Sequence, residues 1–160
     1  MNATTLHALL DESALALAGL EGVSVQIGFC REPYFRTIRQ PILSLQIEEA
    51  KLSECGMYQT LGQSVSGYLK GQMADVTLSA VLYLPLMETG ISAEDVFEQF
   101  FASLSGTDSP FTQFWMGQTC FLEGAQCFEA KMSAGGQLLL SSEQSETPIQ
   151  NVQLQIGEVH

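Results

Sequence analysis

The chain has 160 residues, of which 46% are hydrophobic and 15% are charged, and its formal net charge is −12. This composition is too apolar for a disordered chain, and the length suits one domain with a sizeable core. No run of about 18 apolar residues is present to span a bilayer, and the acidic excess opposes nucleic-acid binding.

The first 50 residues predict a helix followed by two half-buried strands. Apolar residues near helical spacing indicate a helix over about residues 5–18. The runs VSVQIGF (23–29) and ILSLQIEEA (42–50) then alternate apolar and polar residues, as strands with one buried face do. The stretch between them contains Pro33 and Pro41, which favours the extended tip of a hairpin.

This proline-bounded stretch, FCREPYFRTIRQP, contains three of the six basic residues of the chain. With Glu32 it carries +2 from residue 31 to 39, so the remainder carries −14. Arginine and aromatic residues are enriched in protein interfaces. We therefore expect an acidic partner or a second copy to bind the arm; the interface residues would be Arg31, Tyr34, Phe35, Arg36 and Arg39. A solvated tip without a partner and a nucleic-acid site are the alternatives.

The middle of the chain predicts a loop, a strand and a helix. Glycines and polar residues without a regular period indicate a long mobile loop from Ser53 to Gln72, a second candidate contact surface. The segment ADVTLSAVLYLP (74–85) alternates strongly and predicts a central strand. Ser92, with Asp95 three positions on, indicates the capped start of a helix that reaches Leu104.

The last third predicts more strands and a tail. Strands are expected over about 112–122 and 126–134, with a turn near Gly124 and a chain reversal at Gly135 and Gly136. Residues 141–160 are expected to be a polar linker and a C-terminal strand that pairs with its own sheet or a neighbouring subunit. We therefore predict a single α+β domain over residues 1–140: two layers, a mostly antiparallel sheet and two main helices packed on one face.

Residues for catalysis or cofactor binding are sparse. The two histidines are His7, inside the first predicted helix, and His160, and the sequence contains no G-x-S-x-G elbow or phosphate-binding glycine motif. The four cysteines show no zinc-site spacing. Cys120 and Cys127 would face each other across a two-residue turn, but two free buried thiols are favoured. We expect no catalytic residue, cofactor or metal ion, and therefore no enzyme.

The order of elements resembles that of tail terminator and tail completion proteins of long-tailed phages and phage-tail-like particles. The segments that carry the resemblance are VSVQIGFCREPYFRTIRQPILSLQIEEAKLS and DVTLSAVLYLPLMETGISAEDVFEQFFASLSG, with Tyr83, Leu84 and Pro85 at a step that those proteins share. The long loop and the C-terminal strand depart from the pattern. The resemblance implies a hexameric ring that caps the head-proximal end of the tail tube, stops its polymerisation and joins the neck.

On this hypothesis, the partners are other copies of the chain, the tail tube protein, and neck or sheath proteins. DNA would pass through the ring without specific binding, and no membrane would take part. The protein would be assembled in the bacterial host cytoplasm into a virion or a tail-like particle. The alternative is an acidic soluble binding module or inhibitor that acts on a basic protein.

Overall fold

Seven strands and three helices make up the part of the chain that the structure, a computed structural model, describes: residues 3–54, 60–64, 67–87 and 89–145. The helices are α1 (Leu6–Leu17), α2 (Glu32–Phe35) and α3 (Ala93–Leu104). The strands are β1 (Ser24–Ile27), β2 (Ile42–Glu54), β3 (Thr60–Ser64), β4 (Gly67–Pro85), β5 (Phe111–Met116), β6 (Cys120–Leu122) and β7 (Cys127–Ser145). The helices pack against a mostly antiparallel sheet, which confirms the predicted α+β class.

The strand order is β1-β2-β4-β7-β5, with β3 paired to β4 and β6 paired to β7. β4 is therefore central, as predicted, and it pairs with β7 over its whole length. The predicted hairpin between residues 23–29 and 42–50 is wrong, because β1 and β2 are parallel, with Ser24 opposite Ile42. Parallel neighbours need a crossover connection of a dozen or more residues, and residues 28–41 supply it.

Both main helices begin at a side-chain cap, and Ser92 is the cap that the sequence indicates for the second. The hydroxyl of Thr5 accepts a hydrogen bond from the backbone N–H of Ala8 at 3.1 Å, and Ser92 accepts one from Asp95 at 3.1 Å. Each bond satisfies an N–H that lacks a partner in the first turn of the helix. The predictions of helices at 5–18 and 92–104 are confirmed.

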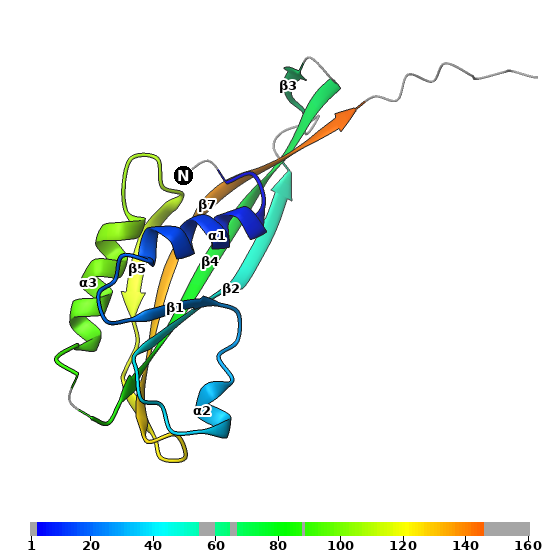
Figure 1. Cartoon of the computed structure of the whole chain (residues 1–160). Helices are drawn as coiled ribbons and strands as arrows, with labels where there is room; N and C mark the ends of the chain where they lie inside the picture. The colour runs from blue at the N-terminus through cyan, green and yellow to red at the C-terminus, as the bar shows by residue number, and fades with distance from the viewer. Residues whose placement is uncertain (1–2, 55–59, 65–66, 88, 146–160) are drawn as a thin grey trace, which may run out of the picture.

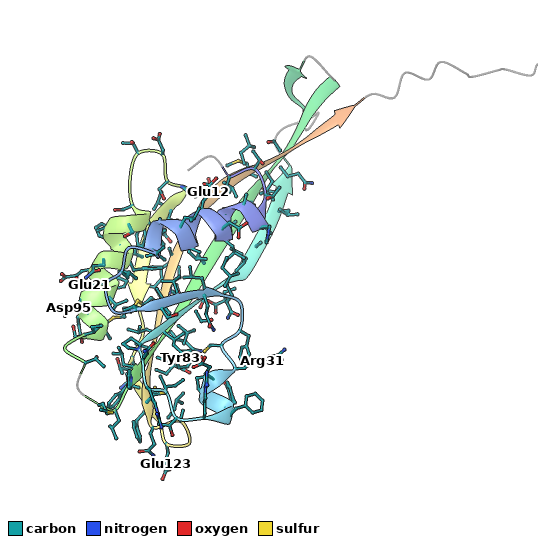
Figure 2. The ribbon with its side chains drawn as sticks, in the orientation of Figure 1. Glu12, Glu21, Arg31, Tyr83, Asp95 and Glu123 are labelled. Carbon is teal, nitrogen blue, oxygen red and sulfur yellow. The ribbon has the colours of Figure 1, made fainter. Side chains whose placement is uncertain are left out.

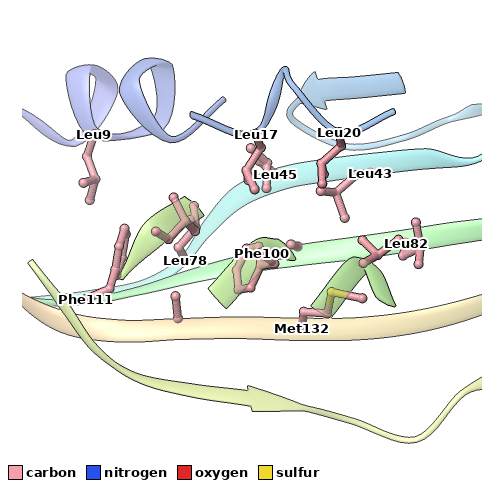
Figure 3. Packing of buried hydrophobic residues seen from close by; sticks show 14 of the residues in the cluster. Leu9, Leu17, Leu20, Leu43, Leu45, Leu78, Leu82, Phe100, Phe111 and Met132 are labelled. Carbon is pink, nitrogen blue, oxygen red and sulfur yellow. The ribbon is translucent and has the colours of Figure 1, made fainter. Parts of the chain in front are cut away.

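The main core lies between these two helices and one face of the sheet (Figure 3). Leu9 and Leu17 of α1 and Phe100 of α3 are fully buried against it. The sheet contributes alternate residues of neighbouring strands, among them Leu43, Leu45, Leu78, Leu82 and Met132. Because side chains alternate across a strand, the residues between these positions face the opposite side of the sheet.

A second, smaller core lies on that opposite side, under the crossover. Cys30 and Ile38 of the crossover pack there with Val81 and Tyr83 of β4 and with Cys127 of β7. The sheet is thus covered by α1 and α3 on one face and partly by the crossover on the other.

The predicted mobile loop from Ser53 to Gln72 is wrong for the residues that the structure describes. β2 continues to Glu54, β3 occupies Thr60–Ser64 and β4 starts at Gly67. Together with the C-terminal part of β7, these strands project beyond α1 as a β-extension (Figure 1). Backbone hydrogen bonds to neighbouring strands keep these residues extended. The polar, glycine-rich sequence gives no local sign of this long-range pairing.

β7 is also longer than predicted. It runs without a reversal through Gly135 and Gly136 and ends at Ser145, so residues 141–145 are strand instead of linker. The predicted C-terminal strand lies outside the described residues. The turn before β7 places Cys127 opposite Leu122, and Cys120 opposite Glu129. Both thiols are free, but the expectation that both are buried is wrong for Cys120, which is exposed while Cys127 is buried.

Candidate protein-binding surface

The crossover, which we call the arm (residues 28–41), is held to the sheet at both ends, by β2 at its start and by β1 at its end. The N–H of Gly28 donates to the carbonyl of Leu45 at 2.7 Å, and the Ser44 hydroxyl donates to the carbonyl of Gly28. At the other end, the N–H of Ser24 donates to Pro41 at 2.9 Å. Between these points α2 forms a single helical turn with proline in its first turn, where the missing N–H of proline has no cost.

The inner side of the arm is anchored in the second core. Cys30, Pro33 and Ile38 are buried, and the N–H of Ile38 donates to the carbonyl of Ala125 at 3.2 Å. Burying a side chain such as Ile38 contributes about 1.5–3 kcal/mol. The arm is therefore fixed to the sheet by apolar contacts, unlike the solvated tip that we considered from the sequence.

The outer side of the arm carries the predicted interface residues, and all five are exposed: Arg31, Tyr34, Phe35, Arg36 and Arg39. Tyr34 is 66% exposed and Phe35 is 80% exposed. Sequence reasoning missed Phe29, which it assigned to the buried face of a strand. Phe29 is 63% exposed and stacks on Tyr34 with ring centroids 5.4 Å apart. Exposed aromatic rings that lie together on a fixed support mark a protein-binding surface.

The three arginines of the arm differ in their surroundings. Arg36 pairs with Glu32, with 2.7 Å between Nη2 and Oε1. Arg39 lines a pocket of about 550 Å³ with Arg36 and Glu32. Arg31 extends away from the ribbon (Figure 2), and neither Arg31 nor Arg39 forms an ion pair with any described residue. Two arginines thus remain available to a partner.

The helical layer on the other face of the sheet carries the opposite charge. α1 and α3 contain no lysine or arginine. The acidic residues of this layer and its adjoining loops are Asp11, Glu12, Glu21, Glu94, Asp95, Glu98 and Asp108. The molecule is therefore electrostatically polar across its sheet, with a cationic arm on one side and an acidic helical layer on the other.

Tyr83 and Cys127 lie beneath the arm, and the pKa of each side chain is raised. Burial raises the pKa of the Tyr83 phenol well above its usual range, and the neighbouring Glu129 carboxylate raises it further. Burial likewise raises the pKa of the Cys127 thiol, again with Glu129 as the next cause. Both groups are protonated near neutral pH. Because the thiolate is the nucleophilic form of cysteine, Cys127 serves as a packing residue.

Alkaline pH is expected to destabilise the protein because of these two groups. In the unfolded chain the thiol and the phenol return to pKa values of 9.0 and 10.0. They then lose protons at lower pH than in the folded state, so the free energy of unfolding falls above about pH 9. Urea denaturation measured at several pH values above 9 should show that the free energy of unfolding of the variant Y83F/C127A falls less steeply with pH than that of the wild-type protein. Equal slopes for the variant and the wild-type protein would contradict this assignment.

The part of the sheet that the arm leaves uncovered is mostly polar. A pocket of about 610 Å³ lies there, with Asp75, Gln113, Trp115 and Gln137 among its lining residues. The amide of Gln137 donates to the Asp75 carboxylate at 2.8 Å, and the Trp115 ring covers Gly135. Gln137 and Asp75 thus already pair with each other, so this surface is a weaker candidate than the arm.

The described residues contain no group of three or more His, Cys, Asp or Glu side chains that would hold a metal ion. They also include no helix with the length and hydropathy needed to cross a membrane. His7 lies on the exposed side of α1, with Nε2 3.4 Å from the Asp11 carboxylate.

A scan of protein-family models and a search of curated proteins find no match to the chain.

Proposed function

We propose that this protein is a structural subunit that assembles into a ring, as the tail terminator proteins it resembles do. The observation that carries the proposal is the arm: its inner side is anchored in a core, while its outer side presents arginines and aromatic rings to solvent. Such a surface favours binding to a partner that is both acidic and partly apolar. The acidic helical layer of another copy has this character.

The two oppositely charged surfaces lie on opposite faces of the sheet, and this arrangement suits head-to-tail contacts. A contact between two different surfaces leaves one of each unpaired in a dimer, so further copies add until a ring closes. A closed ring has two ends that differ from each other. In the proposed role, a hexameric ring covers the tail tube with one end and receives the neck with the other.

The β-extension supplies a further surface for this role. It carries strands beyond the helical layer (Figure 1). The exposed side chains of Leu52 and Leu139 lie at its base, since Leu52 is opposite Ala74 and Leu139 is next to Leu138, two residues of the main core. Projecting strands can add to the sheet of a neighbour through backbone hydrogen bonds. We propose that the β-extension contacts neighbouring subunits or the tube protein. The net charge of −12 would keep DNA from adhering to the ring.

Reversing the charge of the arm tests the proposal. The double variant R31E/R39E is expected to remain folded and to lose self-association, because it replaces the attraction between arm and helical layer by repulsion. The matched control compares R31E alone with K131E, which makes the same change of net charge on β7, outside the arm and the β-extension, and should still assemble. Light scattering gives the mass of each, and circular dichroism checks that each is folded.

Two outcomes would count against the proposal. Assembly of R31E/R39E at wild-type strength would remove the arm from the interface. A wild-type protein that stays monomeric alone and with its tube protein, yet binds a basic protein, would support the acidic binding module instead.

A further inference from the structure

A third pocket lies in the acidic helical layer, between α1 and the loop that follows α3. Its volume is about 400 Å³, and its lining includes Glu12 and Ala16 of α1 and Asp108 of the loop. Oε2 of Glu12 is withdrawn from solvent and accepts no hydrogen bond from any described residue. The pocket thus combines an acidic lining with a carboxylate oxygen that lacks a partner.

A buried carboxylate oxygen without a hydrogen bond is costly, since it loses water and gains nothing in return. Two hydroxyl groups near the pocket have other acceptors: Ser13 donates to the carbonyl of Leu9, and Ser109 donates to the carbonyl of Leu104. Neither helix carries a lysine or arginine. The lining of this pocket is therefore acidic with no basic residue on either helix, and a cationic group from another molecule would complement its charge.

We propose that Arg31 of a second copy of the chain enters this pocket and pairs with Glu12. The guanidinium group is a planar cation with several hydrogen-bond donors, so it suits a pocket lined by the carboxylates of Glu12 and Asp108. Arg31 has no ion pair among the described residues, and it extends away from the ribbon (Figure 2). Arg36 already pairs with Glu32, and Arg39 lies beside the same carboxylate-bearing residue.

Exposed apolar side chains lie beside both charged groups, so the two surfaces are also complementary in their apolar character. Arg31 stands near the exposed rings of Tyr34 and Phe35 on the arm, while Leu15, 75% exposed, is one helical turn from Glu12 on α1. Contact between these apolar groups would bury the exposed rings around the ion pair. Removing water in this way strengthens the attraction between the two charges.

The contact must join two molecules, because the arm and α1 lie on opposite faces of one sheet. It is also head-to-tail, with one arm and one pocket from each copy left for the next neighbours. This inference rests on the proposed ring-forming function and identifies the surfaces that meet in it.

The test compares single and paired substitutions in the full-length protein. E12Q and R31Q should each weaken self-association by about tenfold or more, since each leaves the other charge without its partner. E12R and R31E should abolish it singly, and the combination E12R/R31E should restore assembly to within about threefold of wild type. E98R is the matched control, because it makes the same charge change in α3 outside this pocket, and it should assemble normally. Sedimentation equilibrium gives the association constants, and circular dichroism excludes unfolded variants.

The outcomes separate this inference from the proposed function. Wild-type assembly with full association of E12Q and E12R would overturn the pairing and leave ring formation standing. Failure of the E12R/R31E combination to recover, although both single variants are folded and monomeric, would also overturn it. A strictly monomeric wild-type protein would overturn both.

Discussion

Replacing Gly136 by alanine is expected to destabilise the protein by about 3 kcal/mol or more, at the upper end of the usual cost of overpacking. A Cβ atom at this position would overlap the carbonyl oxygen of Pro110, and it would lie 2.6 Å from the carbonyl carbon of Pro110 and 2.9 Å from Cα of Phe111. All three atoms belong to the backbone, so no side-chain rotation can relieve the overlap. Strand β5 would have to move away from β7.

Thermal unfolding followed by circular dichroism measures this effect. The matched control is G124A in the turn before β7, where a Cβ atom would meet nothing within 4 Å. That variant should keep its melting temperature within a few degrees. Equal melting temperatures for G136A and G124A would show that β5 does not approach β7 as closely as the structure has it.

Replacing Phe100 by alanine is expected to lower the free energy of unfolding by about 3–5 kcal/mol. Phe100 is fully buried, and its ring lies edge-on to Phe114 with centroids 6.1 Å apart. Truncation removes the ring and leaves a cavity between α3 and the sheet. For a domain of this size the melting temperature should fall by about 6–20 °C.

The neighbouring residue provides the control for this prediction. Phe101 also packs edge-on against Phe114, with centroids 5.0 Å apart, but it is 48% exposed. F101A should therefore cost about 1 kcal/mol, in line with an aromatic pair that is only partly buried. An F101A variant as unstable as F100A would show that α3 is rotated relative to the packing described.

Helices and the central strand were predictable because their signals are local. Ser92 and the apolar stripe that ends in Leu104 specify a capped amphipathic helix without knowledge of the rest of the chain. The alternation around Leu78 and Leu82 likewise specifies a strand with one face in the core. These features depend on residues at most a few positions apart.

Strand pairing was not predictable in the same way. The alternation in residues 23–29 and 42–50 is the same for parallel and antiparallel neighbours, so the sequence favoured a simple hairpin where a crossover exists. The paired glycines at 135 and 136 suggested a reversal, yet Gly136 is required by the approach of β5 to a continuous strand. Long-range contacts decide both features.

The candidate site shows the same division. The cluster of arginines and aromatic residues in one short segment predicted that Arg31 and its aromatic neighbours are exposed, and they are. This signal could be read from the composition of the segment alone. The pocket at Glu12 was not apparent, since Glu12 belongs to α1 and Asp108 to a distant loop. Only the packing of α1 beside α3 places them around one pocket.

The mass of the wild-type protein in solution tests the central proposal most directly. Sedimentation velocity or native mass spectrometry, from micromolar to millimolar concentration, should show a closed particle with a fixed number of copies, expected to be a hexamer. Its size should stop growing with concentration, because a ring has no free surfaces for addition. A single species of 17.4 kDa at every concentration, with the tube protein present or absent, would contradict the proposed function.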